Sequence, residues 1–242
     1  MTNDDPKITL FPDAHEREAL KKAHIIHHTP PPSREPVLNL PPAVKALCLI
    51  NIAIFLLGKL FPGLLTDERL YDLAFVPARY SGDAPLGFTA LFSPFTHMFI
   101  HAGWLHLSIN IGTLMAFGAG LEKTMGGRRL LLFYFATGLI GAFTHALIYP
   151  HAETPMIGAS GAVSGLFGGI LMMMNEEGVM GGTQGDYKKL LPFILIWVGI
   201  SVFFGLYGMP GVDNPIAWTV HIGGFIAGLL LYKPVRHLKI QH

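Results

Sequence analysis

Charged residues are scarce in this sequence of 242 residues: Asp, Glu, Lys and Arg make up 14%, whereas 51% of the residues are hydrophobic. A soluble domain usually carries about 25% charged residues, so the deficit favours a chain that is solvated largely by lipid. The net charge of +1 excludes a nucleic-acid-binding protein, which needs a basic face. The single cysteine, Cys48, excludes a disulfide framework and a zinc site built from cysteines.

Six apolar stretches follow the first 43 residues, each close to the roughly 20 residues that a helix needs to cross a bilayer. Their frequent glycines favour close packing between membrane helices. We therefore expect an all-α, polytopic membrane protein with six transmembrane helices. Segment 65–101 is much longer than the typical connection of about five residues, so we expect it to form a structured outer loop. The six expected spans are 44–64, 102–121, 129–148, 157–174, 189–207 and 215–232.

The sequence predicts a polar tail at each end of the chain. Residues 1–43 contain a proline cluster and a histidine-rich patch, and we expect a largely disordered tail with one polar helix over 13–24. Residues 233–242 form the second expected tail. Fourteen of the 17 Lys and Arg residues lie in the N-terminal segment, in links 122–129 and 175–189, or at the C-terminus. Because positive residues favour the cytoplasmic side, we expect both termini in the cytoplasm and the protein in a bacterial inner membrane.

Polar residues inside the expected spans gather in one layer near the outer surface. Span two contains His106 and Asn110, one helical turn apart, span four opens with Gly158-Ala159-Ser160-Gly161, and span six contains His221. At 1.5 Å per residue, Ser160 and His221 both lie roughly 5 Å below the outer end of their helices. Polar residues are costly in a membrane and are functional candidates.

The chemistry of this layer is acyl transfer. A serine hydroxyl becomes a nucleophile when a base takes its proton, and His221 is the candidate base for Ser160. The backbone N–H of Ser160, at a helix start where such groups have no intrahelical acceptor, is a candidate oxyanion donor together with His106 and Asn110. Gly158 and Gly161 would let a substrate backbone approach closely. No Asp or Glu lies in this layer, so the expected unit is a Ser-His dyad.

The order and spacing of these motifs resemble the rhomboid family of intramembrane serine proteases over residues 44–232. The resemblance rests on His106-x-x-x-Asn110, the Gly-x-Ser-Gly motif at 158–161, and His221-x-x-Gly224-x-x-x-Gly228. It implies a serine endopeptidase that cleaves the transmembrane segments of single-span substrates near the outer leaflet, with no metal or organic cofactor. It also implies supporting roles for His97 and His101 in the first loop, and for Glu122 at the cytoplasmic end of span two.

The sequence departs from the family pattern at two places. Ser93-Pro94 stands near the position of a frequent aromatic-Arg pair, and Ser164 replaces an aromatic residue that stacks beneath the catalytic histidine in some members. The second departure leaves open what holds the ring of His221. We further expect the connection 208–214 to act as a mobile cap over the site.

Several other interpretations stay open at this point. A rhomboid-like protein without proteolytic activity would bind client transmembrane helices, and a transporter would need a deeper polar site and repeated halves. Ser160 and Asn110 would then serve helix packing and interhelical hydrogen bonding. A zinc site at His97, His101 and His106 has the helical spacing of a ligand set but lacks a carboxylate or thiolate.

Overall fold

A computed structural model describes residues 13–18, 39–179, 186–208 and 217–239 of the chain. The chain divides into two compact units, Met1–Asn39 and Leu40–His242. In the first unit, residues 14–18 are helical, and the backbone N–H of Glu16 donates to Asp13 Oδ1 at 2.7 Å, which satisfies an N–H at the helix start. The rest of the helix expected over 13–24, and the histidine-rich patch that follows it, lie outside the described residues.

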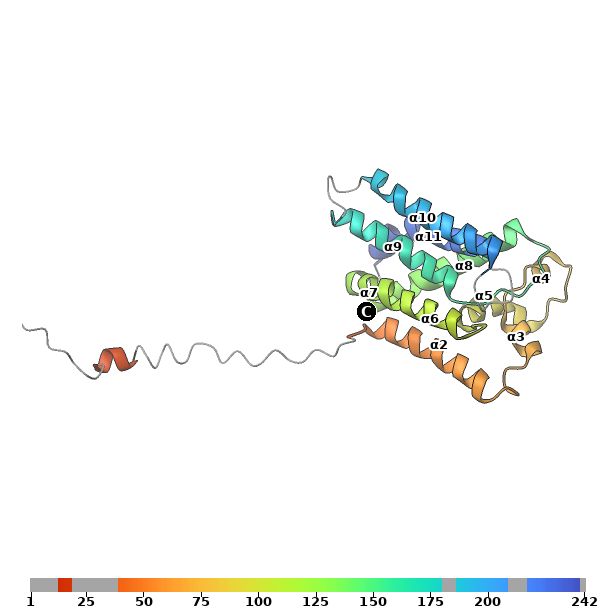
Figure 1. The fold of residues 1–242 in the computed structure, drawn as a ribbon, viewed down its shortest axis with the longest axis horizontal. Coiled ribbons are helices and arrows are strands. Elements are labelled where there is room, and N and C mark those ends of the chain that lie inside the picture. Colours follow the sequence, from red (N-terminus) through yellow and green to blue (C-terminus); the bar gives the residue numbers. More distant parts are fainter. Residues whose placement is uncertain (1–12, 19–38, 180–185, 209–216, 240–242) are drawn as a thin grey trace, which may run out of the picture. The chain divides into compact units, whose positions relative to one another are not determined.

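The second unit is helical throughout its described part, which confirms the all-α prediction (Figure 1). An isolated antiparallel bridge pairs Phe75 with Met156. The helices, in chain order, are α2 (Pro42–Leu60), α3 (Asp67–Leu73), α4 (Ala78–Ser81), η1 (Phe88–Leu91), α5 (Ser93–Thr96), η2 (His97–Phe99), α6 (Trp104–Thr113), η3 (Leu114–Gly118), α7 (Ala119–Met125), α8 (Gly127–Ile148), α9 (Ser160–Glu176), η4 (Tyr187–Leu190), α10 (Leu191–Tyr207) and α11 (Trp218–Arg236).

Four helical stretches of the described chain are long and apolar enough to cross a membrane. They are α2, the continuous helix α6–η3–α7, α8, and η4 with α10. Helix α9 has 17 residues, and α11 is glycine-rich and ends with Lys233 and Arg236; neither is among the four. The integral membrane character of the protein is therefore supported by its helices, while the count of six spans stays a prediction.

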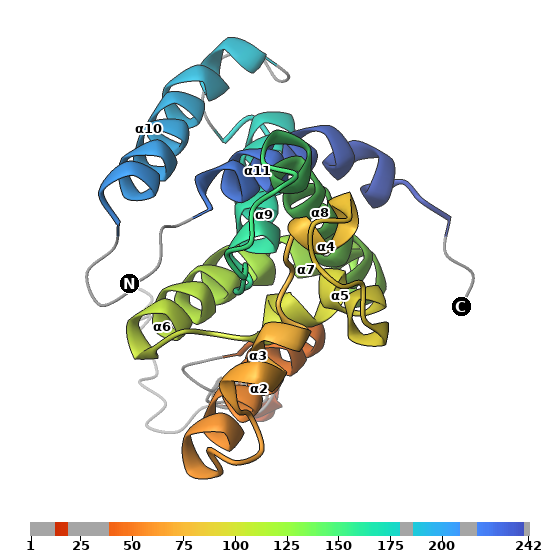
Figure 2. The same cartoon turned by 90° about the vertical axis from the view of Figure 1, so that its right-hand side faces the viewer.

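Helix α9 lies against both α8 and α11, and small residues allow the close approach (Figure 2). A Cβ atom added at Gly224 of α11 would lie 2.1 Å from the carbonyl oxygen of Gly161 on α9, and one at Gly228 would lie 2.1 Å from that of Gly165. Only glycine fits at such contacts between two backbones. The glycines of α9 and α11 therefore set the distance between the two helices.

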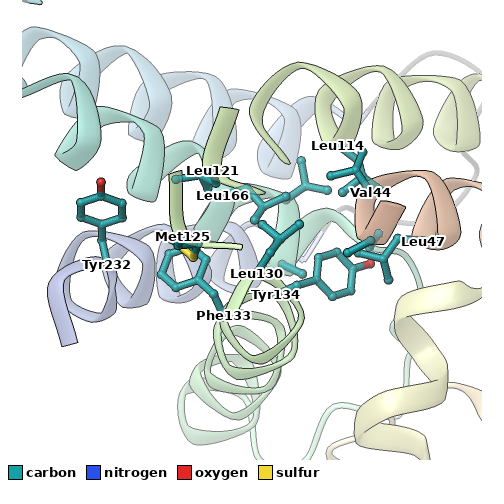
Figure 3. Close-up of a cluster of buried hydrophobic side chains, with 14 of the residues drawn as sticks. Val44, Leu47, Leu114, Leu121, Met125, Leu130, Phe133, Tyr134, Leu166 and Tyr232 are labelled. Carbon is teal, nitrogen blue, oxygen red and sulfur yellow. The ribbon is translucent and has the colours of Figure 1, made fainter. Parts of the chain in front are cut away.

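Apolar side chains from helices along most of the second unit, from α2 to α11, form the main core. Val44, Leu114, Leu121, Leu130 and Leu166 are all buried there (Figure 3). At the end of α7, the buried carboxylate of Glu122 accepts hydrogen bonds from the backbone N–H groups of Ala43 (2.9 Å) and Val44 (2.8 Å). This carboxylate satisfies the first turn of α2, whose N–H groups have no intrahelical acceptor, and it ties α2 to α7.

The segment between α2 and α6 contains five short helices in place of a bare loop. Backbone hydrogen bonds join it to the segment that precedes α9. Phe75 and Met156 exchange two such bonds, Ala78 N donates to Ala152 O at 3.0 Å, and Gly158 N donates to His97 O at 2.8 Å. The segment between α2 and α6 therefore holds the chain that leads into Ser160.

Candidate active site

Ser160 is the first residue of α9. The preceding turn depends on Gly158, whose φ of +114° lies in a region that residues with a Cβ rarely adopt. A Cβ at this position would also lie 2.6 Å from Nε2 of His106. Gly158 therefore allows both the turn into α9 and the close approach of the His106 ring.

The imidazole of His221 meets the hydroxyl of Ser160. Nε2 of His221 lies 2.9 Å from Ser160 Oγ, which is a normal hydrogen-bond distance. The two residues are 61 positions apart in the chain and come from different helices, α11 and α9. With Nε2 unprotonated, the serine hydroxyl donates to it, and this is the arrangement that a general base requires.

His106 and Asn110 lie one turn apart on α6, as the spacing predicts. The side-chain amide of Asn110 donates to the carbonyl oxygen of His106 at 2.8 Å, which leaves its second hydrogen for another acceptor. The structure therefore brings His106 close to Gly158, and it places both α6 side chains in the wall of the same cavity as Ser160 and His221.

This cavity has a volume of about 870 Å³ and opens between α6, α9, α10 and α11. Apolar side chains of α6 and α10, such as Ile109, Trp197 and Phe204, make up much of its wall. A mostly apolar pocket with a few convergent polar groups is the usual form of a ligand site.

His97 and His101 lie outside the wall of this cavity. His97 is buried, its ring contacts Phe75, and its Nδ1 lies 2.9 Å from the carbonyl oxygen of Ser93. Burial lowers the pKa of His97 to about 4, so the ring is neutral at pH 7. His101 is buried with its ring 5.0 Å from that of His106. His97 thus contacts residues of the first loop and His101 lies beside the His106 ring. Within the described ranges no group of three potential metal ligands converges.

Gly161 faces α11, away from the cavity. A Cβ there would lie 2.6 Å from Cγ1 of Val220. Its surroundings favour a role in helix packing over the role in substrate approach that the sequence suggested.

His145 is not among the site residues that the sequence predicts. It lies on α8 and lines the cavity, and its Nδ1 is 2.7 Å from Oγ1 of Thr219. The sequence offered one indication that His145 belongs to the site, because it is an ionisable residue inside an expected span.

The family of this chain is shown by its similarity to known proteins. The rhomboid domain model matches residues 89–237, which is more than half of the chain. The chain belongs to the rhomboid family. RHOMBOID-like protein 5 of Arabidopsis thaliana is 36% identical over 135 residues, which cover 55% of this chain and 40% of that protein. Rhomboid-type serine protease 2 of Emericella nidulans is 32% identical over 134 residues, 55% of this chain and 25% of that protein.

A bacterial relative is matched over a larger share of its own length than these two proteins. A putative rhomboid protease of Bacillus subtilis is 31% identical over 140 residues, 56% of this chain and 63% of that protein. The matched region spans 31% to 41% of the length of five Arabidopsis relatives. The rhomboid domain and the apolar helices make this an integral membrane protein, and the named serine proteases support protease activity at the level of the family.

Proposed function

We propose that this rhomboid is an intramembrane serine endopeptidase that cleaves transmembrane segments of single-span membrane proteins near the outer leaflet. The observation that supports this function best is the 2.9 Å contact between His221 Nε2 and Ser160 Oγ inside a largely apolar cavity. A hydroxyl and an imidazole in this contact are the minimum that nucleophilic acyl transfer requires.

In the proposed reaction, Ser160 Oγ attacks the carbonyl carbon of the scissile peptide bond while His221 Nε2 takes the hydroxyl proton. The C–N bond then breaks, and His221 returns the proton to the leaving amine. A water molecule, deprotonated by the same ring, hydrolyses the acyl-enzyme and regenerates Ser160. The aqueous end of the cavity supplies this water.

The oxyanion of the tetrahedral intermediate needs donors that are already in place, each worth about 3 kcal/mol. The backbone N–H of Ser160 is in the first turn of α9, where no intrahelical acceptor exists. His106 and the second amide hydrogen of Asn110 are the proposed side-chain donors, since both residues line the cavity beside Ser160.

Helix α10 is the proposed side of entry for a substrate helix. Only 11% of this span is buried, against 28–33% for the other three candidate spans, and Figure 2 shows α10 at the margin of the bundle. Substrates with small or helix-weakening residues near the outer leaflet would unwind there most easily. The expected cap at 208–214 falls almost entirely outside the described residues.

The proposed topology has six spans, with α9 and α11 as the fourth and sixth, and both termini in the cytoplasm. The division into an N-terminal tail (1–43), a membrane domain (44–232) and a C-terminal tail (233–242) belongs to the same proposal. A bacterial inner membrane is the proposed location, supported by similarity to proteins of Bacillus subtilis, although one plant relative is named as mitochondrial.

The direct test is cleavage of a single-span reporter protein by the full chain in proteoliposomes. Ser160→Ala should abolish cleavage and leave the melting temperature unchanged. Ser108→Ala is the matched control, because Ser108 is exposed on α6, away from the dyad. This variant should cleave the reporter at the wild-type rate. Cleavage that persists in Ser160→Ala would refute the protease. Reporter binding without cleavage by the wild-type chain would instead favour a rhomboid-like protein that binds client helices.

A further inference from the structure

The cavity wall contains one imidazole that the proposed reaction does not use. His145 lies near the C-terminal end of α8, and its Nδ1 is 2.7 Å from Oγ1 of Thr219. Thr219 is 1% exposed and belongs to the first turn of α11, two residues before His221. A side-chain hydrogen bond therefore joins α8 to the turn that precedes the proposed base.

Helix α8 also packs closely against this part of α11. A Cβ at Gly141 would lie 2.7 Å from the carbonyl oxygen of Val220, and one at Gly223 would lie 2.4 Å from Oγ1 of Thr144. These contacts allow α11 to lie directly on α8. They are packing contacts and not hydrogen bonds between the two helices, so they fix the separation of the helices but resist rotation of α11 only weakly. The hydrogen bond between His145 and Thr219 supplies a directional restraint.

The first turn of α11 needs such a restraint. The N–H groups at the start of a helix have no intrahelical acceptors, so the first turn is held less firmly than the turns below it. Helix α11 begins at Trp218, and Ala217 at its N-cap makes no side-chain capping bond. Helix α9 contacts this turn through the side chain of Val220, which lies against Gly161, and the contact between the two backbones at Gly224 lies beyond His221.

Helix α9 does not provide an aromatic support for the imidazole. The residue one turn below Ser160 is Ser164, whose hydroxyl donates to the carbonyl oxygen of Ser160 at 2.7 Å. The side chain of Ser164 is thus committed to its own helix and has no ring to place beneath His221. Orientation of His221 therefore depends on how its backbone is held.

We propose that His145 is a positioning residue: through Thr219 it fixes the rotation of the first turn of α11 and thereby holds His221 Nε2 at Ser160 Oγ. This inference rests on the proposed function, since it assigns His145 a role in the reactivity of the same dyad. The positioning role depends on Nδ1 of His145, because that atom makes the hydrogen bond with Thr219.

The test compares the rate at which a fluorophosphonate labels Ser160 in variants of the full chain in detergent. Thr219→Val removes the hydroxyl but keeps the shape, and we expect the maximal labelling rate to fall about tenfold with little change in the concentration that gives half the maximal rate. This is less than the roughly 100-fold loss that a 1 Å misplacement of reacting groups can cause. His145→Leu should give a similar loss, and the double variant should be no slower than either single variant.

Conservative variants and a matched control separate positioning from simple stability. Thr219→Ser and His145→Asn keep polar atoms near the bonding positions and should recover most of the rate. Thr124→Val removes a hydroxyl at the α7–α9 contact, where Oγ1 lies 3.1 Å from Met173 Sδ, and should lower the melting temperature without lowering the labelling rate.

Two results would overturn the inference: a normal maximal rate in Thr219→Val, or losses that multiply in the double variant, which would mean that the two residues act separately. Failure of the proposed function is distinct from both, because the wild-type chain would then show no labelling at Ser160.

Discussion

The substitution Gly224→Ala tests whether backbone contact between α9 and α11 sets the geometry of the dyad. The added Cβ would lie 2.1 Å from the carbonyl oxygen of Gly161, 2.9 Å from its carbonyl carbon and 3.3 Å from its Cα. All three atoms are backbone, so no side chain can rotate away. Since an ordinary contact at Cβ is 3.4–4 Å, the two helices must separate by at least about 1 Å.

This separation acts on the dyad directly, because His221 lies one turn from Gly224 on α11. The contact between His221 Nε2 and Ser160 Oγ would lengthen from 2.9 Å toward about 4 Å, beyond hydrogen-bond range. A misplacement of this size costs up to about 100-fold in rate. Overpacking destabilises a protein by about 1–3 kcal/mol, which exceeds the gain of at most about 1 kcal/mol from replacing glycine by alanine in a helix.

The assay measures two quantities on the full chain in detergent: the rate of fluorophosphonate labelling and the melting temperature. Gly224→Ala should lower both. Gly199→Ala on α10 is the matched control, because an added Cβ there meets nothing within 4 Å, and it should leave the labelling rate unchanged. If Gly224→Ala labels as fast as the wild type, or melts at a higher temperature, the reasoning about the α9–α11 contact is wrong.

Two further predictions concern the parts of the fold that support the site. Glu122→Ala leaves the N–H groups of Ala43 and Val44 without their acceptor and should lower the free energy of unfolding by about 1–3 kcal/mol. Glu122→Gln should give a smaller loss. Equal denaturation curves for Glu122→Ala and the wild type would contradict this prediction. Burial lowers the pKa of His97 from 6.5 to about 4, so below pH 6.5 the unfolded chain binds more protons than the folded one. The melting temperature should therefore be flat above pH 7 and fall as the pH drops from 6.5 toward 4. His97→Asn should reduce that slope, and an unchanged slope would assign the effect to other groups.

That Ser160 and His221 lie at one level of their helices could be predicted from the sequence, whereas the contacts around them could not. Counting residues from the expected helix ends placed Ser160 and His221 at one level, because the rise per residue of a helix is constant. The rotation of each helix about its axis is a different quantity. It depends on tertiary contacts, and an apolar, glycine-rich helix has too little contrast between its faces to reveal it.

His145 and Gly161 illustrate this limit. The sequence places His145 near the end of an expected span but does not show that it faces Thr219 and the cavity, nor that Gly161 faces Val220. The tie between Glu122 and the start of α2 also needed coordinates, since the sequence resemblance indicated only that this glutamate holds the end of span two. The short helices of segment 65–101 were expected as structure, but their backbone bonds to residues 152–158 depend on tertiary contacts.

The central claim is that Ser160 is a nucleophile activated by His221. The most direct measurement is mass spectrometry of the full chain after treatment with a fluorophosphonate, with the modified residue mapped by peptide sequencing. We predict a single adduct on Ser160 that forms in the wild-type chain, is absent in Ser160→Ala, and forms far more slowly in His221→Ala. An adduct on another residue, or equal labelling of Ser160 with and without His221, would contradict the account.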